Sequence, residues 1–172
     1  MKKYLLTIMM VCLACVSAMA ADCKVVSGNK KVWKGATGEA LLNINWSEAQ
    51  YDYKMPLTDK FANLEPFAEA SWSGFVQEFN EECKVQVVKE SKNAKYQIDI
   101  KVTNVDQYVK ITGFIPGPAT KIWGTLTVTD IATGQILVTV AINSLDGGAS
   151  PSPFESFSDS FEKLGEWVAD LD

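Results

Sequence analysis

The chain has 172 residues, with 16 basic and 21 acidic side chains and a formal net charge of −5, and every basic residue is a lysine. Because the sequence contains no histidine and no arginine, it excludes histidine-based triads, histidine metal sites and guanidinium recognition of phosphate or guanine. Nucleic acid is therefore not an expected partner of this acidic chain, whereas its 47% hydrophobic residues suffice for one packed core.

The first twenty residues have the pattern of an export signal. Two lysines precede an apolar stretch over 4–16, and residues 18–20 read Ala-Met-Ala, the small-x-small pattern of a cleavage site. The apolar stretch is too short for a membrane-spanning helix of about 20 residues. We predict a cleavable signal peptide over 1–20 and a single domain over 21–172 without a transmembrane span. The expected location is the periplasm or the outer membrane, and a lipidated mature N-terminus is an alternative.

Two cysteines, Cys23 and Cys83, remain after such a cleavage. In an exported protein this favours a disulfide, which would join the start of the mature chain to the end of a predicted helix. Closing a loop of about 60 residues would stabilise the fold by about 4 kcal/mol. Two separate buried thiols are the alternative interpretation. Two cysteines without histidine are a poor ligand set, so we expect no metal and no cofactor.

Four stretches of alternating apolar and polar residues predict strands, preceded by a small hairpin over 24–33. A shorter strand is expected over 84–88. The apolar members that share one face are Leu42, Ile44 and Trp46; Tyr96, Ile98, Ile100 and Val102; Ile122, Leu126 and Val128; and Ile136, Val138, Val140 and Ile142. Strands of this kind form a sheet with one covered face and one wetter face.

Two stretches have the three- and four-residue spacing of amphipathic helices. The first runs from about 63 to 82, with Ala68, Trp72, Phe75, Phe79 and Cys83 on one stripe. The second begins after Ser152, which suits a helix cap, and its stripe consists of Phe154, Phe157, Phe161, Leu164, Val168 and Leu171. The expected fold is α+β, a two-layer sandwich with a mostly antiparallel sheet of four to five strands and two amphipathic helices on one face.

The element order, together with the hairpin turn Asp130-Ile131-Ala132-Thr133-Gly134, resembles the periplasmic domains of the curli-secretion channel CsgG and the N-terminal domain of TolB. It is also similar to small uncharacterised exported proteins of Gram-negative bacteria, over roughly residues 40–172. The resemblance implies an envelope protein that works by contacts rather than chemistry. No catalytic residue of these families matches, and we interpret Asp130 as a cap of the turn.

The connection that contains Phe114, Ile115 and Pro116 is unusually apolar. Loops normally run over the surface, so these side chains either fold back onto the core or form a contact surface for a partner or a second copy.

Three aromatic residues, Tyr51, Tyr53 and Trp123, form a second candidate site. Aromatic faces stack on sugars and peptides with little loss of conformational entropy. The alternative is that these side chains cover the edge of the core.

We therefore expect a non-enzymatic, exported envelope protein that binds another protein or its own copies. A small-ligand or glycan-binding domain is the alternative. A hydrolase that uses paired carboxylates is a third hypothesis, and its candidate acids are Asp52, Asp59, Asp99 and Asp106. We predict no catalytic residue, because no catalytic, phosphate-binding or calcium-binding motif occurs in the sequence.

Overall fold

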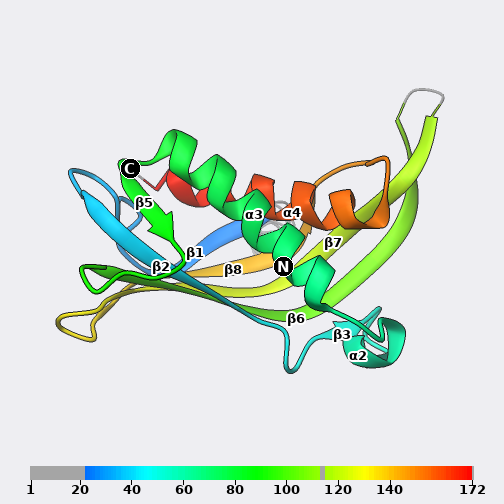
Figure 1. Ribbon diagram of the computed structural model, residues 1–172, viewed down its shortest axis with the longest axis horizontal. Helices are drawn as coiled ribbons and strands as arrows, with labels where there is room; N and C mark the ends of the chain where they lie inside the picture. Colours follow the sequence, from blue (N-terminus) through cyan, green and yellow to red (C-terminus); the bar gives the residue numbers. More distant parts are fainter. Residues whose placement is uncertain (1–21, 113–114, 172) are drawn as a thin grey trace, which may run out of the picture.

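The computed structural model of the chain describes residues 22–112 and 115–171, so the predicted signal peptide lies outside the described residues. An eight-stranded sheet and three helices make up this part of the chain (Figure 1). The elements are β1 (Cys23–Gly28), β2 (Gly38–Asn45), β3 (Gln50–Tyr51), β4 (Met55–Pro56), α2 (Leu57–Lys60), α3 (Glu65–Glu82), β5 (Val85–Val88), β6 (Tyr96–Thr112), β7 (Ile115–Asp130), β8 (Ile136–Asp146) and α4 (Pro153–Ala169).

The longer strands lie in the order β1–β8–β7–β6–β2–β5. The pairs from β1 to β6 are antiparallel, whereas β2 runs parallel to both β6 and β5. Parallel neighbours need a long crossover, and α3 provides it between β2 and β5. The α+β class is confirmed. The sheet is mixed and has eight strands rather than the predicted four to five, because alternation within a strand does not encode the direction of its neighbour and reveals no strand of only two residues.

The predicted hairpin over 24–33 is also wrong. β1 pairs with β8, in a register that runs from Cys23 opposite Ile142 to Gly28 opposite Val138. Gly28 does turn the chain, with a φ of +88°, and a Cβ there would lie 2.2 Å from the Leu137 carbonyl oxygen. The turn was therefore visible in the sequence, but the partner strand was not.

Helices α3 and α4 lie side by side on one face of the sheet (Figure 1). The predicted stripes supply the centre of the core, with Phe75, Phe79, Phe157, Phe161 and Leu164 fully buried. A Cβ on Gly165 would lie 2.5 Å from the Phe75 carbonyl oxygen, so the two helices meet where α4 has no side chain. Two predicted core residues are exceptions, since Phe154 and Ile136 remain 46% and 56% exposed.

Cys23 and Cys83 are both buried, and the described part of the chain shows no disulfide between them. Burial, together with the charge of Asp22, raises the pKa of the Cys23 thiol to about 12, which keeps it protonated at neutral pH. The predicted disulfide is therefore not found, because the fold places both cysteines as packing residues of the core.

Candidate functional site

The strands β6 and β7 extend beyond the rest of the sheet. β6 pairs with β2 as far as Lys101 and with β3 as far as Val105, and β7 pairs with β8 as far as Lys121. Beyond these points, residues 106–112 and 115–120 form a two-stranded ladder with each other. We call this segment the arm, and Figure 1 shows it rising past the N-terminal end of α4.

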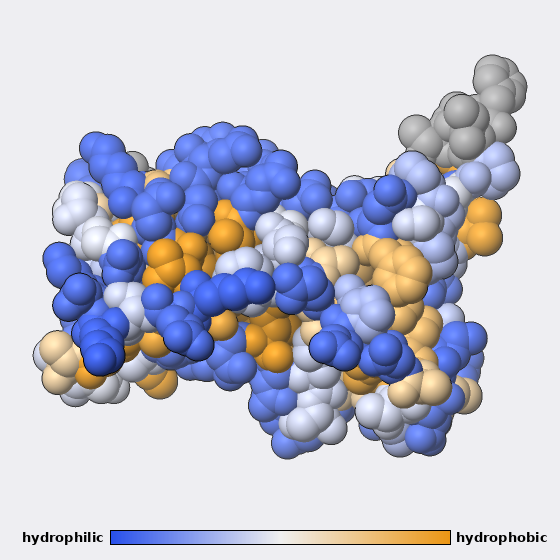
Figure 2. Space-filling model, in the orientation of Figure 1, coloured by the Kyte–Doolittle hydropathy of each residue, from blue (hydrophilic) through white to orange (hydrophobic). Residues whose placement is uncertain are grey.

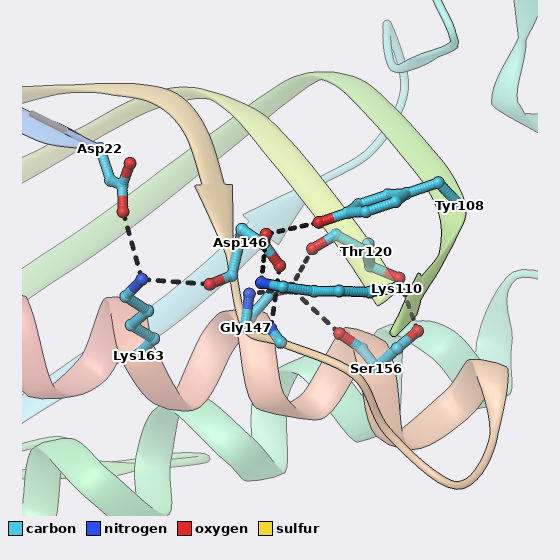
Figure 3. Close-up of polar contacts among 10 residues, drawn as sticks. Asp22, Tyr108, Lys110, Thr120, Asp146, Gly147, Ser156 and Lys163 are labelled. Carbon is cyan, nitrogen blue, oxygen red and sulfur yellow. Dashed lines mark hydrogen bonds and ion pairs between the residues drawn. The ribbon is translucent and has the colours of Figure 1, made fainter. Parts of the chain in front are cut away.

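Asp146, at the end of β8, holds the arm from one side (Figure 3). Its carboxylate accepts a hydrogen bond from the Tyr108 hydroxyl and lies 2.9 Å from the ammonium nitrogen of Lys110, while the Gly148 N–H donates to its other oxygen at 2.9 Å. Burial by itself would raise the pKa of the Asp146 carboxyl, but the hydrogen bonds from Lys110, Tyr108 and Gly148 outweigh it and hold the pKa below its ordinary value. Asp146 is therefore ionised at neutral pH and bridges the two arm residues to the body.

Buried hydroxyl groups attach the arm to α4 (Figure 3). The hydroxyl oxygens of Thr120 and Ser156 lie 2.6 Å apart, and the Ser160 hydroxyl donates to the Thr120 carbonyl oxygen at 2.8 Å. The Ser150 N–H donates to the Pro118 carbonyl oxygen at 2.8 Å, beside the edge of β7. An isolated two-stranded hairpin is marginally stable in water, so these bonds are what hold the arm in one orientation.

One face of the arm is apolar and open to solvent. Val109 and Ile111 are each 70% exposed, and their partners across the ladder are Pro118 and Pro116. Directly opposite residues project from the same face of a sheet, so the four side chains form one strip. Apolar residues are visible at the surface of the arm in Figure 2.

Of the predicted contact residues, Ile115 and Pro116 begin β7, the second strand of this arm. Pro116 is exposed, whereas Phe114 and the side chain of Ile115 lie outside the described residues. Val109 and Ile111 were missed, although their alternation with Lys110 was a signal that the preceding strand continues.

The predicted aromatic group is only partly assembled. Tyr53 is 60% exposed and meets Trp123 edge to face, with ring centroids 5.5 Å apart. Tyr53 occupies the turn between β3 and β4 with a φ of +55°, and its N–H donates to the side-chain oxygen of the buried Asn104 at 2.7 Å. Tyr51 does not join this pair, because its ring packs against Phe61 at 6.0 Å. The structure therefore offers an exposed Tyr53 ring against a half-buried Trp123 ring, rather than a platform of three.

A second aromatic site lies between α3 and β2, in a groove of about 380 Å³. The indoles of Trp46 and Trp72 line it, and Glu65, Glu69 and Glu90 surround them. The Lys89 ammonium lies 4.9 Å from the centre of the Trp72 ring. Both tryptophans were predicted to lie on core-facing stripes. Periodicity shows which face of an element is apolar, but it does not show where along the element that face leaves the core.

Among the acidic candidates, Asp52 and Asp106 interact with each other, whereas Asp99 has a partner elsewhere. Asp99 accepts a hydrogen bond from the Asn43 side chain at 3.0 Å, and Asp130 accepts the N–H and the hydroxyl of Thr133, both at 2.8 Å, as predicted for a turn cap. Burial raises the pKa of Asp106, and the charge of Asp52 adds to this effect.

Asp59 lies in the short helix α2. Among the described residues, no group of three or more Cys, Asp or Glu side chains is arranged to hold a metal ion. Within the same part of the chain, no helix has the length and apolar character needed to cross a membrane.

No family model and no curated protein matches the chain. Among solved structures it is similar to PelC from Paraburkholderia phytofirmans, described as a dodecamer, with 15% identity, a TM-score of 0.48 and coverage of 86% of this chain and 98% of that one. It is also similar to a Helicobacter pylori protein described as a homologue of the neuraminyllactose-binding hemagglutinin, with 10% identity, a TM-score of 0.39 and coverage of 81% and 83%. A Xanthomonas campestris protein of family DUF330 matches with 13% identity, a TM-score of 0.37 and coverage of 83% and 88%. Similarity at this level identifies no family, and the suggested relationship to CsgG and TolB stays a prediction.

Proposed function

We propose that this chain is an exported, non-enzymatic binding module of the cell envelope that docks on another protein chain through the apolar face of its arm. The observation that carries the proposal is the pair Val109 and Ile111, exposed at 70% each on a hairpin that hydrogen bonds hold in place. A projecting, ordered and apolar surface is typical of a contact site rather than of a reaction site.

The energetics of the arm favour binding. Covering apolar surface stabilises a complex by about 25 cal/mol per Å². Ordering a flexible segment would oppose that gain, but the Asp146 contacts and the Thr120–Ser156 bond already order the arm in the free protein. The cost of binding is therefore lower than for a mobile loop of the same composition.

Photo-crosslinking in cells that export the protein tests this function. A photoreactive amino acid at position 109 or 111 is expected to give a discrete crosslinked protein band. The matched control is the same probe at position 136, since Ile136 is 56% exposed but lies at the opposite end of the sheet from the arm. If the probes at 109 and 111 give no crosslinked band, or no more of it than the probe at 136, the arm is not a docking site.

The groove between α3 and β2 supports a second candidate function, binding of a small neutral ligand such as a glycan. It presents two indoles and three carboxylates, a combination that can stack on a sugar ring and accept its hydroxyl hydrogens, and the buried Trp46 indole N–H has no hydrogen-bond partner among the described residues. Titration with envelope glycans should change the tryptophan fluorescence of the protein but not of a Trp72→Ala variant. An unchanged spectrum in the original protein would argue against this candidate.

A further inference from the structure

The arm also has an open backbone edge, on the side of β6 that faces away from β7. The Asp52 N–H donates to the Val105 carbonyl oxygen on this side at 2.9 Å, and the Tyr51 hydroxyl approaches the Gln107 carbonyl oxygen at 3.5 Å. Backbone groups of a strand point to the same edge at every second residue. The N–H and C=O groups of Val109 and Ile111 therefore point outward too, and no strand pairs with them in the described part of the chain.

Other edges of the sheet are poor templates for strand addition. On the β7 side of the arm, Pro116 and Pro118 have no N–H group, and the Pro118 carbonyl oxygen already accepts the Ser150 N–H. The outer strand β1 is interrupted by a register shift between Val25 and Ser27, and the outer strand β5 is only four residues long. Bulges, prolines and short strands block edge-to-edge pairing, and the outer edge of β6 over 107–111 has none of these three. Its one charged residue, Lys110, is paired with Asp146 of the same chain.

We propose that a second copy of this chain pairs with this edge, β6 to β6 and antiparallel, around a twofold axis at Val109. This inference rests on the proposed role of the arm as a docking site and names its partner. The paired segment is 107–111 in both copies, and the product is a sheet that continues from one molecule into the other.

The charges along the segment select the register. A twofold axis at Val109 places Lys110 opposite Tyr108 of the second copy. The hydroxyl of that Tyr108 donates a hydrogen bond to Asp146 of its own copy, so each ammonium group approaches an aromatic ring and a carboxylate of the other molecule. An axis at Lys110 would instead place the two ammonium groups opposite each other, and like charges directly opposite destabilise a strand pair. Charge therefore disfavours the axis at Lys110. An axis at Tyr108 would place Lys110 opposite Asp106, but it would also place Ile111 opposite Val105, whose edge is occupied by β3 and whose carbonyl oxygen already accepts the Asp52 N–H.

The same register also pairs the exposed apolar groups. The two Val109 side chains lie opposite each other, and Ile111 lies opposite Gln107 of the second copy, all on the face that bears Pro116 and Pro118. The outward groups of residues 107, 109 and 111 provide about four backbone hydrogen bonds in an antiparallel ladder, because the Gln107 carbonyl oxygen of each copy already meets the Tyr51 hydroxyl. One pairing thus satisfies the open edge and places the two most exposed apolar side chains of the arm beside side chains of the second copy.

Two kinds of variant of the mature protein test the proposal. Val109→Pro removes the outward N–H but leaves the ladder with β7 intact, because that N–H does not point toward β7. Sedimentation equilibrium should show a dimer for the original protein and at least a tenfold weaker association for Val109→Pro. Val109→Ile, which keeps the N–H and the apolar side chain, should remain dimeric. A monomer at every concentration, or a Val109→Pro variant that associates as well as the original, would overturn the inference.

Cysteine substitution reports the register. Val109→Cys should oxidise to a dimer at least ten times faster than Ile136→Cys, since residues opposite each other in an antiparallel pair meet the Cα separation of a disulfide. The two native cysteines are buried and provide an unreactive background. Faster crosslinking by Lys110→Cys than by Val109→Cys would contradict the axis at Val109. If photo-crosslinks at 109 join the arm to a different protein while the purified chain is monomeric, the second-copy inference fails and the proposed docking function stands; if both are absent, both fail.

Discussion

The helix-covered body of the sheet and the arm are built in opposite ways. In the body, the large apolar side chains such as Phe75 and Phe161 are fully buried and the polar ones lie outside. In the arm, Val109 and Ile111 are exposed, whereas the polar groups of Tyr108, Lys110 and Asp146 face one another. The body is thus held by burial of apolar surface and the arm by directed polar contacts, which leaves the apolar residues of the arm available for binding.

The largest expected effect is a difference in unfolding free energy between an apolar truncation in the body and one in the arm. Phe161→Ala should destabilise the protein by about 3–5 kcal/mol, because it opens a cavity beneath α4 where the side chain packs against Trp46. Ile111→Ala, an apolar truncation in the arm, should stay within about 0.5 kcal/mol of the original protein. Urea unfolding of both variants measures the contrast. Equal losses would show that the arm is part of the core.

A polar substitution at the attachment of the arm should weaken the arm and leave the stability of the body unchanged. Asp146→Asn removes the charged partner of Lys110 and should weaken the attachment of the arm by about 1–3 kcal/mol. Hydrogen exchange should therefore become faster at the amides of the arm and remain slow in the centre of β6. Asp52→Asn is the matched control, since Asp52 pairs with Lys54 at the exposed surface, where an ion pair contributes about 0–1 kcal/mol. If the arm amides of Asp146→Asn exchange as slowly as those of the original protein, Asp146 does not hold the arm.

The polar attachment of the arm should also depend on pH. The pKa of Asp146 is lower in the folded protein than its ordinary value of 3.8, so its ionised form stabilises the fold above pH 3.8. That contribution is lost as the pH falls through the lower, folded value. The difference in unfolding free energy between the original protein and Asp146→Asn should therefore be full at pH 6 and smaller at pH 3. A difference that stays constant between pH 6 and pH 3 would mean that the charge of Asp146 does not hold the arm.

The smallest expected effect on folding is at the exposed apolar pair. The double variant Val109→Ser, Ile111→Ser should unfold within about 0.5 kcal/mol of the original protein, because neither side chain is buried in the monomer. Its association should nevertheless be lost. Ile136→Ser is the control that removes another exposed apolar side chain, 56% exposed, from a different part of the sheet. Association that survives in the double variant would place the contact surface elsewhere.

The candidate site was only partly predictable. Residue type alone pointed to the apolar connection and to Tyr53 and Trp123, because aromatic and apolar residues are unusual in a loop or on the polar face of a strand. The role of Asp146 was not visible, because its partners Tyr108 and Lys110 lie 38 and 36 positions earlier in the chain. An open edge at Val109 was equally hidden, because it exists only where the neighbouring strands end before β6 does.

The sequence by itself determined the two long helices, α3 and α4, and the body portions of β2, β6, β7 and β8 with most of their buried faces, because side-chain periodicity is a local property that burial of apolar surface then selects. It also determined the turn capped by Asp130, whose side-chain hydrogen bonds are both with Thr133, three residues later. Only the tertiary structure decided that β1 joins β8, that β2 runs parallel to β6, and that the arm projects with its apolar face uncovered. Those features depend on the pairing of distant segments and on the relative lengths of neighbouring strands, which no single stretch of the chain encodes.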